Sequence, residues 1–363
     1  MKYQFKAVKA DLVPWEDIEG SQDSTCFHTY QWCDYLRCIN CYPYVVEVLF
    51  HNEKVGCFIG ERVWRGFWIL AAPWDGIGTY TQGLTMLKSI AEEERVAIYQ
   101  QLAEWVFANK IAVMMQIDDW QLRRDSAEWI PYEVFKQDTL ERLGMPYSVR
   151  PTLYLPIAGK SEEELWAGLH YKSCKYSINK ANKLGLYVRR ITDKNEIKRF
   201  AQYHYKQLVE VCAKQGMRPK PSQSQKRMQT LCEALFPNRV IMLECIGKDD
   251  NGEEQIMSTG IFCVDKGECI YWTGASFQRY QKYCPNELMV WEAIKMIREM
   301  GGGALNYGGM ATYKLKFGTI YAYVPRIVFT KYKWTYQLKL FAKRMYFSIR
   351  HNMAKLIGKK SFK

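Results

Sequence analysis

The sequence predicts an α/β fold made of two similar units, and three observations support this prediction. The chain has 363 residues, of which 48% are apolar and 15% aromatic, which is ample material for two cores of ordinary size. The same order of strand and helix patterns occurs in each half. Pro146, Pro151 and Pro156 mark a joint between the halves. We therefore expect units at 1–150 and 151–330.

The first unit begins with residue patterns typical of strands. Residues 44–50 and 55–61 are predicted strands around a turn, and a third strand is expected over 67–71. A helix predicted over 90–109 then leads into a strand at 112–117. The order is strand, turn, strand, strand, helix, strand.

The second unit repeats this order. A strand at 239–246 is followed by a polar turn, and a hairpin is expected from 256–264 and 268–274. A helix over 286–300 then leads into a short strand at 304–307. The repeated order indicates a duplicated α/β unit with mixed sheets flanked by helices.

A basic helix is expected directly after the joint, over 161–184. Ser161 and Glu164 have the spacing of a capping box, and Gly185 suits a left-handed cap. The polar residues predicted on one side of this helix include Lys172, Lys175 and Asn179. Two interpretations remain open for that side: a solvated basic surface, or a wall that binds an anionic substrate.

The positive charge of the chain is concentrated at its C-terminal end. Residues 301–363 contain thirteen Lys and Arg and no Asp or Glu, which equals the whole formal net charge of +13. Charge this polarised indicates a negative partner. Within 331–363, apolar residues recur every three or four positions and predict a basic amphipathic helix over 334–358. It would lie on an anionic membrane, pack on the body, or contact RNA.

Compartment and metal content follow from other features. We expect a cytoplasmic protein, because the N-terminus lacks an apolar signal-peptide segment and no apolar stretch could span a membrane. Twelve cysteines are then best interpreted as reduced thiols. The spacing of Cys33, Cys38 and Cys41 matches part of an iron–sulfur pattern, yet no compact fourth ligand follows, so no metal is expected. No DNA partner is expected either.

Three segments of the second half carry a family resemblance through their order and spacing. Residues 165–188 contain a basic helix pattern with Lys180, Ala181 and Gly185. Tyr271-Trp-Thr-Gly-Ala-Ser precedes a helix opened by Pro285, and a glycine-rich turn precedes Lys-Leu-Lys-Phe-Gly at 314–318. Together these segments resemble the FemAB-like and CelD-like acyltransferases of the GNAT superfamily. Lys175 stands where that family usually has Arg, and Asn306 stands where many relatives have Asp.

The resemblance implies two tandem GNAT-like units and transfer of an acyl group to an amine. We expect an N-acyltransferase acting on a cell-envelope or polysaccharide precursor, with acyl-CoA as donor and no permanently bound cofactor. Aminoacyl-tRNA-dependent, Fem-type transfer to a peptidoglycan precursor is the first alternative. It is less favoured because the second unit lacks the long helical hairpin of some tRNA-using relatives. A non-catalytic RNA- or glycan-binding protein is the second alternative. The enzyme could sit peripherally on the inner face of the membrane.

The family pattern favours Lys316, and the proton transfers and anion binding that acyl transfer requires suggest roles for further residues. The catalytic candidates are Lys316, Glu287 and Tyr307. The candidates for binding the donor are Arg279, Lys282, Asn286, Lys314 and Gly318. The candidates for binding the acceptor are Lys172, Lys175, Asn179, Trp74, Asp75 and Tyr80. Lys314 and Lys316 are expected on a strand, with only one of them entering the site, and Lys316 is the favoured one. The glycine turn that grips CoA in GNAT units is missing from residues 278–287, so Arg279 and Lys282 would bind phosphate by their side chains.

Overall fold

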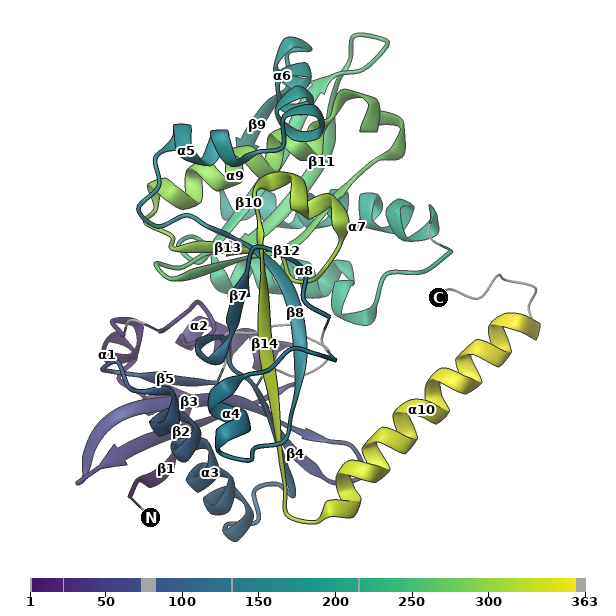
Figure 1. Ribbon diagram of the computed structural model, residues 1–363. Coiled ribbons are helices and arrows are strands. Elements are labelled where there is room, and N and C mark those ends of the chain that lie inside the picture. The colour runs from purple at the N-terminus through teal and green to yellow at the C-terminus, as the bar shows by residue number, and fades with distance from the viewer. Residues whose placement is uncertain (1, 22, 73–82, 132, 215, 357–363) are drawn as a thin grey trace.

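Two lobes joined by a pair of long strands make up the molecule (Figure 1), which we describe from a computed structural model. The structure describes residues 2–21, 23–72, 83–131, 133–214 and 216–356. In the first half the elements are β1 (Gln4–Val8), α1 (Trp15–Glu19), α2 (Tyr30–Cys38), β2 (Tyr42–Phe50), β3 (Glu53–Trp64), β4 (Trp68–Ala72), β5 (Leu84–Met86), α3 (Glu92–Ala108), β6 (Met114–Asp118), β7 (Arg124–Ser126) and α4 (Asp138–Arg142).

The second half contains a similar series. Its elements are β8 (Tyr147–Pro156), α5 (Glu162–Gly168), a π-helical turn (Tyr171–Lys175), α6 (Tyr176–Lys183), β9 (Tyr187–Arg190), α7 (Ile197–Lys214), α8 (Gln225–Leu235), β10 (Val240–Lys248), β11 (Glu254–Cys263), β12 (Glu268–Ser276), α9 (Pro285–Glu299), β13 (Ala304–Asn306), β14 (Ile320–Thr330) and α10 (Lys333–Leu356). Short 3₁₀ turns lie at Ala10–Leu12, Trp120–Leu122, Lys194–Glu196, Pro221–Gln223, Gln278–Tyr283 and Thr312–Phe317.

The predicted duplication is visible in the sheet. β2, β3, β4, α3 and β6 correspond in order to β10, β11, β12, α9 and β13. In each series the strand after the helix pairs parallel with the strand before it, β6 with β4 and β13 with β12. All strands join one mixed sheet in the order β1-β2-β3-β4-β6-β14-β8-β13-β12-β11-β10-β9, with β5 and β7 attached to its side. The expected α/β class with two GNAT-like units is confirmed.

The two central strands exchange places between the series. β8 comes directly after the first half, yet it pairs with β13 of the second series. β14 comes after the second series, yet it pairs with β6 of the first. The two strands also pair with each other, so they tie both lobes into one sheet (Figure 1). The domain boundary at residue 150 stays a prediction.

Helices cover both faces of the sheet. On one face, α3 packs on the first series and α5, α6 and α9 pack on the second. On the other face, α2 of the first half shares a hydrophobic cluster with α7 and α8 of the second half. This shared cluster adds a second connection between the lobes.

One expected helix is interrupted in the structure. The capping box at Ser161 and Glu164 is present, but α5 ends at Gly168 and Leu169 is extended. The chain then restarts as a π-helical turn capped by His170, whose Nδ1 accepts from the Ser173 amide at 3.3 Å. The prediction of one helix over 161–184 was therefore wrong in its middle. The break occurs where the His170 amide donates to the Lys316 carbonyl at 2.9 Å.

Candidate active site

A glycine turn at the end of β13 forms the frame of the candidate site. Gly308 and Gly309 have φ values of 64° and 134°, which favour glycine. The Gly308 amide donates to Asn306 Oδ1 at 2.8 Å, and the Gly309 amide donates to Thr152 Oγ1 at 2.9 Å. Thr152 itself donates to Asn306 Oδ1 at 2.9 Å. Two buried side chains from β8 and β13 thus hold the backbone of the turn.

A buried acid supports this frame from β12. Asn306 Nδ2 donates to Glu268 Oε1 at 2.6 Å, and Glu268 is 4% exposed. Burial raises the pKa of the Glu268 carboxyl to about 8, against the smaller opposing effects of Asn306 and Arg123. Its second oxygen has no hydrogen-bond partner among the residues that the structure describes. Glu268 therefore carries its proton at neutral pH and acts as a neutral support.

Lys314 is directed into the same turn. Its Nζ donates to the Tyr307 carbonyl at 2.6 Å and to the Gly309 carbonyl at 3.5 Å. The residue is 8% exposed, and burial lowers the pKa of its amine to about 8. No carboxylate is paired with it among the ion pairs of the described residues. Lys314 is thus a cation held by backbone carbonyls alone.

Lys316 lies two residues after Lys314 and faces a carboxylate. Its Nζ is 2.5 Å from Glu287 Oε1, and each side chain is 18% exposed. Glu287 lies in the first turn of α9, which begins at Pro285. The two lysines lie in the 3₁₀ turn Thr312–Phe317, so the expectation of a strand here was wrong. They still diverge, because residues two apart in a 3₁₀ turn are about 240° apart around its axis.

Gly318 closes the turn against α5. Its φ is 72°, and a Cβ at this position would be 2.8 Å from the Gly168 carbonyl oxygen. A larger residue would therefore push α5 away from the lysine turn. This close approach, together with the bond from His170 to Lys316, explains why the basic helix is interrupted at this point.

Tyr307 lies in the core beside the lysines. Its ring stacks on Phe317 at 5.7 Å between centroids and meets Tyr271 edge-on at 5.9 Å. The hydroxyl is buried and has no hydrogen-bond partner within the described part of the chain. Burial raises its pKa well above the ordinary value, so the hydroxyl keeps its proton. Its role as proton donor stays a prediction.

The predicted donor-binding residues line the approach to α9. Arg279 stacks on Phe277 and Tyr280, with its guanidinium carbon 5.1 and 4.8 Å from the ring centroids. Lys282 is ion-paired with Asp250 at 2.5 Å. Where GNAT units carry a glycine turn, this chain has the 3₁₀ turn Gln278–Tyr283.

Asn286 connects the start of α9 to β12. Its Nδ2 donates to Ser276 Oγ at 2.9 Å. Its Oδ1 is buried and has no hydrogen-bond partner in the described residues. An acceptor oriented in this way suits a donor group on a ligand or a water molecule.

The predicted acceptor residues are dispersed. Lys172 and Asn179 are exposed on the π-turn and α6, whereas Lys175 is half-buried and donates to the Ala167 carbonyl at 3.0 Å. Trp74, Asp75 and Tyr80 lie outside the described residues. The site therefore brings together Lys314, Lys316, Glu287, Tyr307 and Gly318, with the basic helix beside them.

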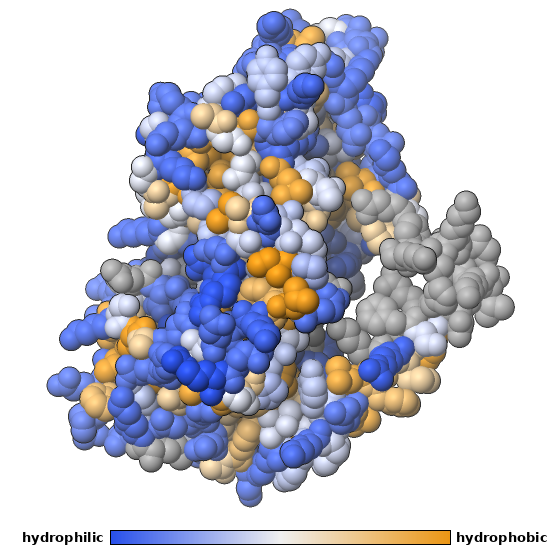
Figure 2. All heavy atoms as spheres, in the orientation of Figure 1, coloured by the Kyte–Doolittle hydropathy of each residue, from blue (hydrophilic) through white to orange (hydrophobic). Residues whose placement is uncertain are grey.

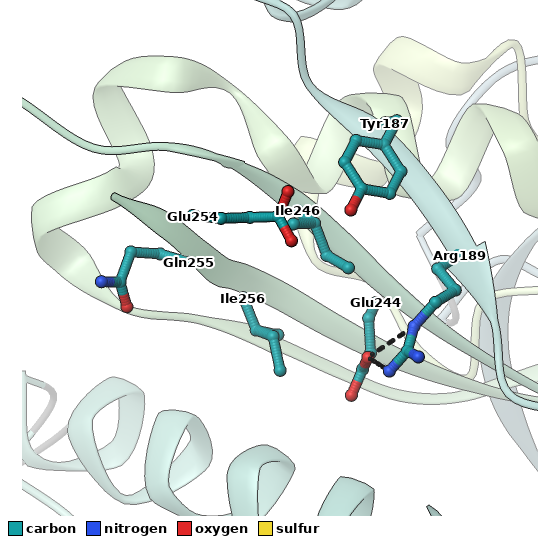
Figure 3. A pocket seen from close by; sticks show the side chains of 7 residues that line it. All are labelled: Tyr187, Arg189, Glu244, Ile246, Glu254, Gln255 and Ile256. Atoms are coloured by element: carbon teal, nitrogen blue, oxygen red, sulfur yellow. Dashed lines mark hydrogen bonds and ion pairs between the residues drawn. The ribbon is translucent and has the colours of Figure 1, made fainter. Parts of the chain in front are cut away.

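A polar hollow elsewhere in the second lobe is not part of this cluster. It encloses about 220 Å³ beside β9, β10 and β11 (Figure 3). Arg189 points to Glu244 at its base, with Nη2 2.6 Å from Oε2. Arg189 and Arg199 each pair with both Glu244 and Glu196, so these two positive charges are matched by two carboxylates.

Sequence reasoning missed the buried support of the site. Thr152 and Glu268 were not among the candidates, and Asn306 was noted only as a departure from Asp. A Glu at the first position of a predicted strand usually faces solvent, so nothing in the local pattern marks Glu268 as buried. Its burial results from pairing with β13, which is contact distant in sequence.

Comparisons with known proteins agree with this description. Residues 170–315 match the acetyltransferase (GNAT) domain family. The crystal structure of FemX superposes with a TM-score of 0.64 at 12% identity, covering 88% of this chain and 96% of FemX. A C-terminal domain of a putative lysylphosphatidylglycerol synthetase from Agrobacterium fabrum superposes with a TM-score of 0.49 at 12% identity. The superposition covers 90% of this chain and 95% of that domain. A search of the curated proteins finds no match.

These findings agree with the resemblance seen in the sequence. Residues 170–315 match a GNAT acetyltransferase domain, and the fold of the chain as a whole is similar to that of FemX. No helix in the described ranges is long and apolar enough to cross a membrane.

Proposed function

We propose that this GNAT-type acyltransferase is an N-acyltransferase that moves an acyl group from acyl-CoA to an amine of a cell-envelope or polysaccharide precursor. One observation carries the proposal. Lys316 pairs with Glu287, and Lys314, two residues earlier, bonds to the adjacent glycine turn, at the C-terminal end of the matched GNAT domain. This set has one more positive charge than negative, which suits a developing oxyanion or a phosphate.

The residues supply the parts that amide formation needs. The acceptor nitrogen attacks the thioester carbonyl carbon, the C–N bond forms, and the C–S bond breaks. The amine proton passes to Glu287, directly or through one water, and the CoA thiolate takes up a proton as it leaves. Lys316 donates to the oxyanion that develops on the carbonyl oxygen, and Lys314 adds positive charge behind the turn. No covalent intermediate is required.

The donor would be held by side chains where other GNAT units use backbone amides. Arg279 is exposed, stacked on two aromatic rings, and without an ion pair among the described residues. A guanidinium held in this way is prearranged for a phosphate. Asn286 offers a buried acceptor one residue before Glu287. Lys172 and Asn179 remain the proposed contacts for the acceptor.

Cysteine chemistry supports a reducing compartment for this reaction. All twelve cysteines are free, and none is paired in a disulfide. Burial raises the pKa of Cys174, which is near Lys316, to about 12, so its thiol stays protonated and does not act as a nucleophile. We therefore place the reaction in the cytoplasm, where acyl-CoA is available.

Fem-type aminoacyl transfer is the second candidate, and the likeness of the whole fold to FemX favours it. In that case the donor is an aminoacyl-tRNA ester, and the same groups serve, with a C–O bond breaking in place of C–S. The two candidates differ in the donor, and the second takes a peptidoglycan precursor as its acceptor.

The test supplies the purified chain with an amine-bearing precursor and either acyl-CoAs or aminoacyl-tRNA, and follows the acylated product by mass spectrometry. Acylation from CoA is the expected result, and acylation from tRNA alone would replace it with the second candidate. Lys316→Ala and Glu287→Gln should each lower the rate about 100-fold or more, because each removes a group that acts in the transition state.

A matched control comes from the same helix. Lys295 and Glu292 form an ion pair at 2.7 Å with side chains 26% exposed, and they lie outside the site. Lys295→Ala should leave the rate unchanged. If it lowers the rate as much as Lys316→Ala, or if no donor reacts, the site assignment fails and a non-catalytic role in binding RNA or glycan becomes the better explanation.

A further inference from the structure

The base of α10 is attached to the first lobe by one side of the helix. Tyr336 packs on the cluster of Ile69, Ala71 and Met114 from β4 and β6. Lys339 Nζ donates to Gln116 Oε1 at 2.5 Å. These contacts determine the direction of the helix, which extends away from the body (Figure 1).

A row of large apolar side chains lies on another side of the same helix. Its members and their exposed fractions are Trp334 59%, Leu338 47%, Phe341 61%, Met345 45% and Ile349 54%. Steps of four, three, four and four residues place them in one stripe. Tyr336 and Lys339 lie roughly on the opposite side. Hydrophobic side chains are visible along the projecting helix in Figure 2.

This arrangement differs from that of a terminal helix packed on its own domain. Such a helix buries its apolar stripe and exposes its polar side. Here the contacts with the body leave most of the stripe in solvent, and Trp334 at its base meets a ring of the body, Phe67, edge-on with 6.5 Å between centroids. A stripe of this size in water indicates a surface that some partner covers.

The charge around the stripe identifies that partner. Residues 331–363 contain ten Lys and Arg and no Asp or Glu, and six of the ten lie within α10. Lys333 and Arg344 are exposed. A second copy of the chain would bring two equally basic helices together, which is unfavourable. RNA would meet the charges but would leave the apolar stripe in water. An anionic bilayer accepts both, because acyl chains take the stripe and headgroups take the cations.

We propose that α10 docks the protein on an anionic phospholipid bilayer, with the stripe from Trp334 to Ile349 inserted between headgroups. Docking would hold the second lobe close to the membrane surface. The proposal does not depend on the acyl-transfer reaction, since it concerns binding alone.

Flotation of the full chain with vesicles tests it directly. We expect binding to vesicles of phosphatidylcholine mixed with phosphatidylglycerol, and little binding to phosphatidylcholine alone. Phe341→Ser should weaken binding roughly tenfold, because a buried Phe side chain is lost from the bilayer. The double variant Lys333→Glu and Arg344→Glu should weaken it at least about thirtyfold, because two attractions become repulsions.

A charge-matched control separates docking from net charge. Lys214→Glu with Lys226→Glu makes the same change in net charge at exposed positions of the second lobe. This variant should bind as the unaltered chain does. Equal losses in both double variants, equal binding to neutral vesicles, or no effect of Phe341→Ser would overturn the proposal. So would a concentration-dependent dimer that Phe341→Ser dissociates, because the stripe would then face a second copy.

Discussion

The two series differ in how a basic side chain near the start of the long helix is paired and buried. In the first series, Arg95 at the start of α3 is 5% exposed and bonds to Asp119 at 2.6 Å and Asp23 at 2.9 Å. It also donates to the Leu84 carbonyl. In the second series, Lys316 beside the start of α9 meets the single carboxylate of Glu287 and is 18% exposed.

This difference suggests that Arg95 stabilises the fold, whereas Lys316 is available to a ligand in the proposed site. Arg95 has two acidic partners, and the Tyr99 hydroxyl adds a bond to Asp119 at 2.5 Å. The charge is therefore compensated within the fold and is closed to a ligand. Lys316 pairs with Glu287, and Lys314, two residues earlier, has no carboxylate partner among the described residues. One positive charge therefore remains for a ligand to neutralise. Under the proposed mechanism, the first unit of the duplication acts as scaffold and the second carries the chemistry.

The largest expected effect follows from removing the structural cation. Arg95→Met should lower the free energy of unfolding by about 3–5 kcal/mol, because Asp119 and Asp23 lose their buried partner. Lys316→Met should cost at most about 1 kcal/mol, because its ion pair is partly solvated. Urea unfolding followed by tryptophan fluorescence measures both.

A control for this contrast lies on the first lobe. Arg124 pairs with Glu92 at 2.7 Å with about a third of each side chain exposed. Arg124→Met should resemble Lys316→Met in stability. If Arg95→Met is no more destabilising than Arg124→Met, the distinction between the two cations is lost.

A middle-sized effect concerns the pH dependence of stability at Lys314. The pKa of its amine is about 8 in the folded chain, against about 10.5 when unfolded. Between these values the unfolded chain binds more protons, so this residue makes stability rise with pH across that window. The integrated difference is about 3 kcal/mol. This additional stability is fully present above pH 10.5 and is lost as the pH falls through 8.

Denaturation from pH 7.5 to 10.5 measures this contribution as a difference between variants. Lys314→Met should lack the rise, whereas Lys295→Met should retain it. Parallel curves for the unaltered chain and Lys314→Met would show that Lys314 is not buried as described.

The smallest effect compares two buried threonines, one in each lobe. Thr85 Oγ1 donates to Asp23 Oδ1 at 2.7 Å in the first lobe, and Thr152 holds the glycine turn in the second. Thr85→Val and Thr152→Val should each lower the free energy of unfolding by about 1–2 kcal/mol, through lost hydrogen bonds.

Activity distinguishes these two variants. Thr152→Val should also lower the acyl-transfer rate about tenfold, because the glycine turn whose carbonyls hold the Lys314 amine loosens. Thr85→Val should not. An equal loss of activity in the two variants would mean that stability alone explains the effect.

Local patterns were sufficient for most of the elements. The hairpin β11–β12, the helices α3 and α9, the capping box at Ser161 and the left-handed Gly185 lie where the sequence predicts them. Each depends on contacts between residues a few positions apart, and the spacing of residue types in the sequence indicates such contacts. Lys316 also had a signal, since the family pattern favoured it, whereas Glu287 was a candidate because amide formation needs a proton acceptor.

Other features had no local signal. The burial of Glu268 depends on pairing with β13, and the break at His170 depends on the amide bond to Lys316. Burial lowers the pKa of Lys314, and this burial depends on the turn formed by Tyr307 and Gly309, whose carbonyls accept hydrogen bonds from its amine. None of these partners is adjacent in sequence to the residue it affects.

The sequence by itself determined the order of elements, the duplication, the basic C-terminal segment and the residue types at the site. Only the tertiary structure decided that β8 and β14 exchange between the two series, and that the apolar stripe of α10 faces away from the body. The physical reason is range. Periodicity and caps report contacts between near neighbours, whereas strand pairing and the side on which a helix docks depend on surfaces that only the folded chain brings together.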